Sequence, residues 1–234
     1  MIEKSYQYLC LKLCNRIRSW LFNTACNLLQ KEKESIQMID VNLSVDVLNV
    51  MTLKHFPVKN IRVFTSPGSS VNIFRDKCIQ YFQMNELSSQ LIQEKPDIIM
   101  MSFSLNSLEM NIQEFSDMCR YIIHSGAICI GTMYDKENLE KFIGNEINKM
   151  LKVEPLGNDV YDLIFTYNLY GGMAIQNRVK VYPQEYIRDV VHRTDPRLSI
   201  EFTNFLDSGI IDNDTMPCIK ESLSTRTCFI IRKL

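Results

Sequence analysis

Glycine is scarce in this sequence, and the shortage is concentrated in its first part. The 234 residues include only 8 glycines, where average usage of about 7% would give about 16. All of them lie at or after Gly68, so residues 1–67 contain none. Folds that hold a nucleotide in a glycine-rich loop near the N-terminus need residues without side chains in that loop. The sequence therefore argues against an ordinary cofactor loop in this region.

Long apolar runs and paired cysteines are also missing. No apolar run approaches the about 18 residues of a membrane-spanning helix, and no signal-peptide pattern opens the chain. The eight cysteines never form a Cys-x-x-Cys pair, and several lie in apolar runs such as Ala127–Ile130. We therefore expect reduced thiols, no metal site and a cytoplasmic location. The formal net charge of −1 gives no overall basic surface for nucleic acid.

The hydrophobic pattern alternates between helical and extended segments. Apolar residues at three- and four-residue steps predict helices at 4–31, 45–55, 71–83, 111–124, 135–150 and 184–192. Short apolar runs predict strands at 36–40, 61–65, 98–104, 127–132, 161–167, 178–182 and 227–232. The alternation predicts an α/β fold with a mainly parallel sheet, closed at one edge by antiparallel C-terminal strands.

We expect one domain over residues 1–234, with three parts. These are an N-terminal helix (1–31), an α/β core (36–150) and a β-rich C-terminal part (151–234). Ligands of such sheets bind at the carboxyl ends of the strands. The segments that begin at Asp40, Thr65, Ser102 and Gly131 are therefore the positions to inspect.

Four stretches near these positions carry a resemblance when they are taken in order. They are Asn15–Ser19, Ile36–Asp40, Asp97–Ser107 and Ile130–Leu139, the last beginning Ile-Gly-Thr. Together they resemble the messenger-RNA cap guanine-N7 methyltransferases, including those of large DNA viruses. The later segments Tyr161–Tyr182 and Thr227–Lys233 are similar to that family's antiparallel region and closing strand.

The resemblance implies a Rossmann-like class I methyltransferase fold and a place in messenger-RNA capping. It also implies S-adenosylmethionine as the cofactor, capped RNA as a ligand, and a protein partner in a viral capping or transcription assembly, in a viral factory or virion. In an active site of this kind, the cofactor-binding residues are Arg18, Asp40, Asn42, Ser66 and Ser102. The residues for cap and RNA are Asn15, Phe103, Asn106, Ser107 and Asn177.

The sequence departs from the family at these same positions. Asp40–Ser44 stands where the family has Asp-x-Gly-x-Gly, and Thr65-Ser66-Pro67 lacks the acid that holds the ribose hydroxyls. Ser102–Ser107 stands where the family has Gln-Phe-x-x-His-Tyr, and it keeps only the phenylalanine, as Phe103. Near Asn177 the family has a glutamate that accepts hydrogen bonds from the guanine edge. Methyl transfer to N7 needs no general base, so positioning is most of the catalysis. We predict a degenerate site, with S-adenosylmethionine binding weak or lost and no catalytic residue.

Three functions stay open at this point. The first is a noncatalytic subunit or regulator of a capping assembly, and the second is a divergent but active cap guanine-N7 methyltransferase. The third is an RNA-binding module, for which the candidate residues are Arg16, Arg18, Arg62, Arg75 and Arg178.

Single residues also have two interpretations each. Asp40 either contacts a ligand or caps the next helix, and Asn15 and Arg18 either lie on a solvated helix face or contact a phosphate or partner. Phe103 belongs to the core or to a pocket, while Asn106 and Ser107 line a pocket or cap a helix. The scattered His55, His124 and His192 are assigned no catalytic role.

Overall fold

The computed structural model describes most of the chain, and its first element is a long helix. The described residues are 2–32, 35–41, 61–65, 79–83, 86–101, 112–144, 151–167, 173–205, 220 and 223–234. Helix α1 spans Ile2–Leu29, and its second half packs on the main sheet through Ile17, Leu21 and Ala25. These residues recur every four positions, which places them on one face of the helix. The helix predicted at 4–31 is confirmed.

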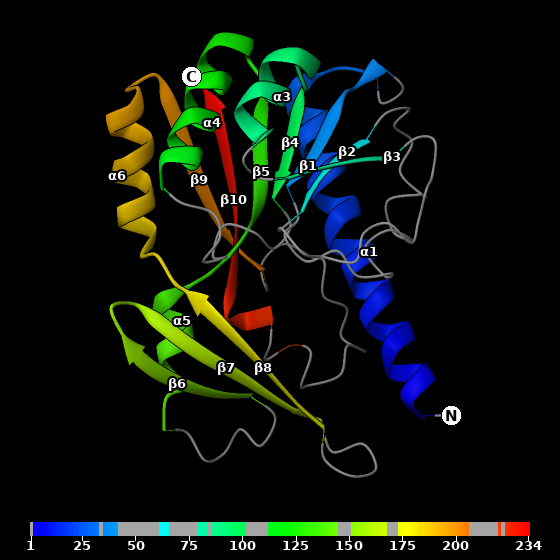
Figure 1. Ribbon diagram of the computed structural model, residues 1–234, viewed down its shortest axis with the longest axis vertical. Coiled ribbons are helices and arrows are strands. Elements are labelled where there is room, and N and C mark those ends of the chain that lie inside the picture. The colour runs from blue at the N-terminus through cyan, green and yellow to red at the C-terminus, as the bar shows by residue number, and fades with distance from the viewer. Residues whose placement is uncertain are drawn as a thin grey trace.

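The main sheet has seven strands in the order β3-β2-β1-β4-β5-β10-β9. Their bounds are β1 Met38–Val41, β2 Ile61–Thr65, β3 Ile79–Gln83, β4 Ile98–Met101, β5 Ile128–Tyr134, β9 Leu198–Asn204 and β10 Arg226–Lys233. The pairs from β3 to β5 are all parallel, while β10 is antiparallel to both β5 and β9. The predicted α/β fold, mainly parallel with antiparallel C-terminal strands, is confirmed (Figure 1).

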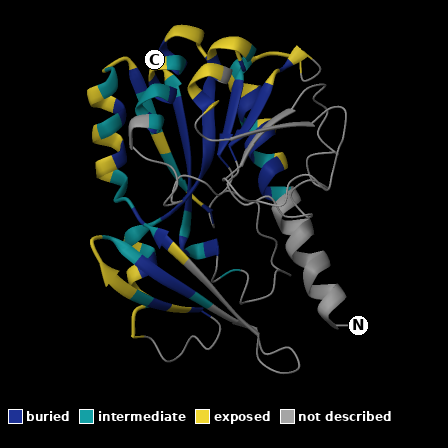
Figure 2. Ribbon diagram, viewed as in Figure 1, coloured by how far each residue is buried: buried dark blue, intermediate teal, exposed yellow. Residues whose placement is uncertain are grey.

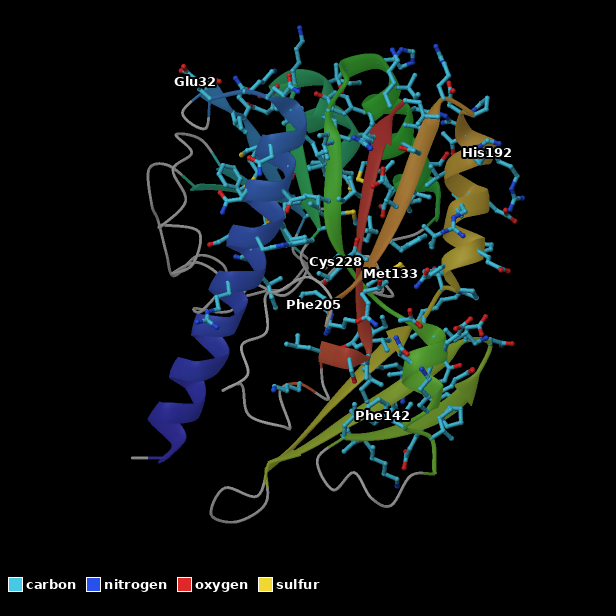
Figure 3. All side chains as sticks on the ribbon, turned by 180° about the vertical axis from the view of Figure 1, so that it is seen from behind. Glu32, Met133, Phe142, His192, Phe205 and Cys228 are labelled. Atoms are coloured by element: carbon cyan, nitrogen blue, oxygen red, sulfur yellow. The ribbon has the colours of Figure 1, made fainter. Side chains whose placement is uncertain are left out.

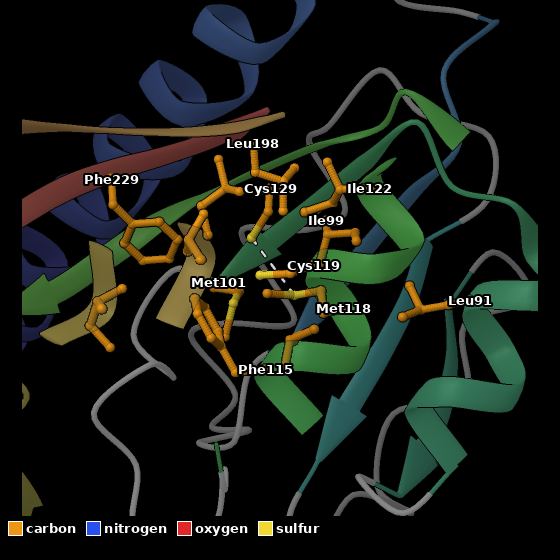
Figure 4. Packing of buried hydrophobic residues seen from close by; sticks show 14 of the residues in the cluster. Leu91, Ile99, Met101, Phe115, Met118, Cys119, Ile122, Cys129, Leu198 and Phe229 are labelled. Carbon is orange, nitrogen blue, oxygen red and sulfur yellow. Dashed lines mark hydrogen bonds between the residues drawn. The ribbon is translucent and has the colours of Figure 1, made fainter. Parts of the chain in front are cut away.

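Helices cover both faces of this sheet. One face packs against α1, and the other packs against α3 (Leu87–Glu94), α4 (Ile112–Ser125) and α6 (Gln184–Thr194). The central strands β1, β4 and β5 are buried along their whole length, as expected for the parallel part of a sheet that is covered on both faces (Figure 2). Figure 4 shows how Phe115, Met118 and Ile122 of α4 fill the second face, beside Cys129 of β5.

Residues in the left-handed backbone conformation follow the ends of two of these helices. Gly126, which follows α4, has a φ of +72°, and its N–H donates to the Ile122 carbonyl at 2.9 Å. This is a left-handed helix cap, for which glycine is the preferred residue. Lys95 caps α3 with a φ of 46°, and the following Pro96 cannot continue the helix.

A second sheet is formed by residues 151–180. Its three antiparallel strands, in the order β6-β7-β8, are Leu151–Gly157, Val160–Tyr167 and Met173–Lys180. One face packs with the short helix α5 (Lys136–Glu140) around Leu139, Leu163 and Val181, near Phe142 (Figure 3). The β-rich part 151–234 thus supplies this sheet and also strands β9 and β10 of the main sheet. The expected single domain stays a prediction.

Two of the predicted helices are wrong in part. The helix predicted at 71–83 includes Ile79–Gln83, which is strand β3 and pairs in parallel with β2. The helix predicted at 135–150 ends at Glu140, and residues 141–144 form turns and a bridge from Ile143 to Val153. In both cases pairing with a neighbouring strand prevailed over a local helical pattern.

Other predictions lie close to the observed elements or outside the described residues. Strand β2 has the predicted bounds, and β1 begins two residues later than predicted. Helix α3 and strands β6 and β9 were not predicted at all. The helix predicted at 45–55 and residues 102–104 of a predicted strand lie outside the described residues. No helix within the described ranges has the length and hydropathy needed to cross a membrane.

Candidate functional site

The candidate site lies at the carboxyl ends of the central parallel strands. Strand β1 has β2 on one side and β4 on the other, so the direction of the strand order reverses between β1 and β4. Open α/β sheets bind their ligands outside such a reversal. The described residues here are the ends of β1 and β4, the neighbouring strand β5, and the part of α1 that covers them.

An ion pair between Arg18 and Asp40 occupies the α1 side of this strand end. Nη2 of Arg18 lies 3.1 Å from Oδ2 of Asp40, and both side chains are 0% exposed. Along β1 the side chains alternate, so Met38 and Asp40 face α1 while Ile39 and Val41 face the opposite core. Asp40 thus stands beside Met100, its neighbour on β4, in an otherwise apolar layer.

The surroundings of Asp40 are unfavourable to its charge. Neither carboxylate oxygen accepts a hydrogen bond within the described part of the chain, so the electrostatic attraction to Arg18 is the compensation that the structure provides there. Burial raises the pKa of Asp40 above 3.8, and the nearby guanidinium of Arg18 offsets part of that rise. The pair therefore holds α1 against β1 and leaves no surface of Asp40 open to solvent.

Gly131 on β5 has no room for a side chain beside β4 at the same edge. It pairs with Met101, and an added Cβ would lie 2.3 Å from the Met101 carbonyl oxygen. A Cβ cannot approach a backbone oxygen so closely. Packing against β4 is therefore a sufficient reason for a glycine at position 131. The following Thr132 is fully buried in the sheet.

Of the sequence-predicted site residues, the structure brings Arg18 and Asp40 together. The solvated helix face predicted as one alternative for Arg18 is wrong, because its side chain is buried. The other alternative, a contact with a phosphate or a partner, stays a prediction. Asn15 lies in α1 and Asn177 in β8, where it pairs with Leu163, but their side chains are not described. The other predicted residues lie outside the described ranges: Asn42, Ser66, Ser102, Phe103, Asn106 and Ser107.

The predicted basic strip is only partly described. Arg18 is buried, and Arg178 on β8 binds the carboxylate of Asp162 on β7 in a bidentate arrangement, with distances of 2.7 and 3.0 Å. The two residues are direct cross-strand neighbours, and Arg178 itself stays more than half exposed. The side chains of Arg62 and Arg75 are not described.

Cysteine and histidine residues behave as structural or surface groups. The cysteines whose side chains are described, Cys26, Cys119, Cys129 and Cys228, are buried and form no disulfide. Burial raises the pKa of Cys119 and of Cys228 to about 12, so their thiols stay protonated. His124 is exposed on α4. His192 is exposed on α6 (Figure 3). Among the described residues, no group of histidine, cysteine and acidic side chains has the arrangement of a metal site.

Asp135, which directly follows β5, links two helices at the carboxyl edge and was not singled out from the sequence. Its Oδ1 accepts the Asn138 N–H at 3.1 Å as the N-cap of α5, and its Oδ2 accepts from Nε2 of Gln184 at 2.7 Å. The signal was present in the sequence, because an aspartate directly before a helical segment is a preferred cap.

We expect Asp135→Ala to lower the free energy of unfolding by about 1–2 kcal/mol, since it removes a helix cap and a second hydrogen bond. Asp135→Asn keeps an acceptor for the cap and should lose less. Urea unfolding of the two variants checks this. Equal losses would contradict the capping role.

Comparisons with known proteins give similarity at the level of structure only. No protein-family model matches the sequence, and no curated protein matches it. The structure is similar to that of the CcbJ methyltransferase from Streptomyces caelestis, with 11% sequence identity and a TM-score of 0.60. The alignment covers 94% of this chain and 96% of that chain.

Two further solved structures give the same result. A putative S-adenosylmethionine-dependent methyltransferase from Listeria monocytogenes is 11% identical, with a TM-score of 0.54 and coverage of 92% of this chain and 97% of that one. The glycopeptide N-methyltransferase MtfA, solved with S-adenosylmethionine, is 8% identical, with a TM-score of 0.55 and coverage of 91% and 87%. The chain has the fold of the S-adenosylmethionine-dependent methyltransferases.

Proposed function

We propose that this chain is a methyltransferase-fold subunit that transfers no methyl group itself. Its role is to stabilise or regulate an active partner in a messenger-RNA capping assembly. The observation that carries the proposal is the buried ion pair at the end of β1. Asp40 is the acid at the strand end where this fold admits its cofactor, yet it is fully buried and paired with Arg18.

An acid in this state is a poor fit to a cofactor-binding residue. A carboxylate that binds the hydroxyl or amino groups of a ligand needs open acceptor positions toward that ligand. Asp40 has no exposed surface, and burial raises its pKa, so an approaching ligand meets α1 and not the carboxylate. We therefore derive no methyl-transfer step for this chain.

The sequence around the strand ends supports the same conclusion. Asn42-Leu43-Ser44 follows β1 where backbone close to a cofactor needs glycines, and the end of β2 lacks an acid for the ribose hydroxyls. Methyl transfer to N7 needs no general base, so residues that position the cofactor and the guanine supply most of the catalysis. A chain without them retains the fold but not the reaction.

The link to capping comes from the ordered resemblance to cap guanine-N7 methyltransferases. It extends from the Asn15–Ser19 segment to the closing strand β10, so it includes nearly the whole chain. A subunit of this kind acts by contact with its partner. Its own surfaces, and not a cofactor pocket, then carry the function.

Titration calorimetry of the full chain with S-adenosylmethionine tests the proposal. We expect no binding at micromolar affinity, because the strand-end acid is enclosed by α1. The matched control is an active cap methyltransferase, titrated under the same conditions, which must give a clear binding isotherm. Micromolar binding by this chain alone would overturn the proposal.

A divergent active enzyme is the second candidate, favoured by the complete seven-strand sheet in the order found here. It requires incorporation of labelled methyl groups into capped RNA by the chain alone, and loss of that signal in Asp40→Asn. The proposed subunit gives no incorporation alone. A complex copurified from the native source then shows whether a partner chain supplies the activity.

A further inference from the structure

The second sheet and α5 have a hydrophobic core of their own. Tyr134, Leu139, Leu163 and Val181 belong to it, and none of its described members is shared with the two clusters on the main sheet. Strands β6, β7 and β8 pair with one another in a sheet separate from the main one. We call α5 with these three strands the second unit. It lies beyond the carboxyl ends of the central strands (Figure 1).

The chain enters and leaves the second unit at two points where consecutive side chains belong to different cores. Met133 near the end of β5 is buried in the main core, while the next residue, Tyr134, is buried in the core of the second unit. On the return, Val181 is buried in the second unit and Tyr182 packs against the main core. The boundary between the cores therefore crosses the chain at 133/134 and at 181/182.

A hydrogen bond joins these two crossings to each other. Oδ2 of Asp135, on the outgoing segment, accepts from Nε2 of Gln184, the first residue of α6, at 2.7 Å. Oδ1 of Asp135 accepts the Asn138 N–H and so caps α5 of the second unit. The Asp135–Gln184 hydrogen bond therefore holds the first helix of the second unit to the start of α6, which packs on the main sheet.

Polar contacts also hold the elements of the second unit to one another. Nζ of Lys136 on α5 lies 2.6 Å from Oδ1 of Asp159, in the turn between β6 and β7. The Tyr161 hydroxyl on β7 donates to Oε1 of Glu140 on α5 at 3.0 Å. These contacts lie within the second unit, so they stay intact when the unit turns as one body.

We propose that the second unit is a lid that turns about the two crossings, and that the Asp135–Gln184 hydrogen bond is the clasp that holds it in the observed position. Hinges between bodies that keep their own packing are a few residues at the ends of elements. The lid lies at the carboxyl edge of the main sheet, where open α/β sheets bind their ligands. Its rotation therefore changes access to that edge. The lid belongs to the fold and operates with or without S-adenosylmethionine.

Single-molecule energy transfer in the full chain measures the lid position. Dyes are attached through unnatural amino acids at Leu156 on β6 and Arg120 on α4, which are both exposed, so that both cores stay intact. We expect one main distance population in the original chain. Gln184→Glu places a second carboxylate beside Asp135, where Nε2 now lies 2.7 Å from Oδ2. It should raise the share of molecules with an open lid about tenfold, because like charges that share a site repel each other.

Two matched controls separate the clasp from general effects of the substitutions. Gln93→Glu adds the same charge at an exposed position of α3 and should leave the distance distribution unchanged. Tyr161→Phe removes a hydrogen bond inside the lid, between β7 and α5, and should also leave it unchanged. Gln184→Leu removes the clasp without adding charge, so it should open the lid in the same direction as Gln184→Glu. It also provides the test if Gln184→Glu fails to fold.

An unchanged distance distribution in a folded Gln184→Glu or Gln184→Leu chain would overturn the inference. So would an equal change in Gln93→Glu or Tyr161→Phe, because the effect would then not belong to the clasp. Micromolar S-adenosylmethionine binding in calorimetry would remove the proposed function and leave the lid measurement standing.

Discussion

Replacing Arg18 with Met is expected to lower the free energy of unfolding by about 3–5 kcal/mol at neutral pH. Met has nearly the length of the Arg stem and preserves packing between α1 and the sheet. It leaves the Asp40 carboxylate fully buried without its counter-charge, 0% exposed and beside Met100. An uncompensated buried charge is among the most destabilising single changes known in proteins.

The loss of unfolding free energy in Arg18→Met should be larger at neutral pH than in acid, because it depends on the charge of Asp40. Burial raises that pKa above 3.8, and Arg18 works against the rise, so removing Arg18 raises the pKa further. A carboxyl whose pKa is higher in the folded state stabilises the fold fully below 3.8. That contribution is lost as the pH rises through the raised pKa. Urea unfolding should therefore show a large loss near neutral pH and a small one at about pH 4.

The double variant Arg18→Met/Asp40→Leu provides the decisive comparison. Because both charges are removed, we expect its free energy of unfolding to return to within about 1 kcal/mol of the original or to exceed it. Arg120→Met is a control at an exposed pair with Asp117, where the loss should be about 0.5 kcal/mol. An equal loss at both pH values in Arg18→Met would contradict the buried-charge explanation.

Much of the fold could be predicted from the sequence where apolar runs are bounded by strong breakers. Strand β2 was predicted with its observed bounds because Ile61–Thr65 is short and is followed by Ser-Pro-Gly. The α4–β5 segment was predicted because a helical pattern over 111–124 is followed by a short apolar run at 127–132. These are local signals, and local backbone preference determines the outcome there.

The errors arise where no breaker divides two patterns. Ile79–Gln83 follows a helical pattern without an intervening glycine or proline, so its aromatic and β-branched residues were assigned to the helix. Parallel pairing with the preceding strand β2 makes it a strand, and that pairing is not visible in the local pattern. Strand β9 was different, because Leu198–Asn204 alternates between apolar and polar residues and its signal was overlooked.

The candidate site could be predicted as a set of residues but not as an arrangement. Asp40 was identified because it is an acid at the end of a predicted strand. Arg18 was identified because it lies in the Asn15–Ser19 segment, which resembles part of the family's N-terminal helix. Their pairing depends on which turn of α1 lies over β1. That is decided by helix-on-sheet packing of Ile17, Leu21 and Ala25, which no spacing within the sequence encodes.

Gly131→Ala is expected to lower the free energy of unfolding by about 3 kcal/mol, the upper range for overpacking a core. The new Cβ would lie 2.3 Å from the carbonyl oxygen of Met101 and 2.8 Å from its Cβ, so β4 and β5 would have to separate. Relief on the other side is blocked, because Gly131 also pairs with Phe229 of β10, which is fully buried. Denaturant unfolding measures the loss.

Gly126→Ala is the matched control, because it tests backbone strain without crowding. Gly126 has a φ of +72° and no atom within 4 Å of an added Cβ, so the expected loss is about 1 kcal/mol. Equal losses at the two glycines would contradict the steric argument. The larger loss at Gly131 would show that this glycine is kept by strand packing. Its presence in the Ile-Gly-Thr segment would then be explained by the packing of β4 against β5 alone.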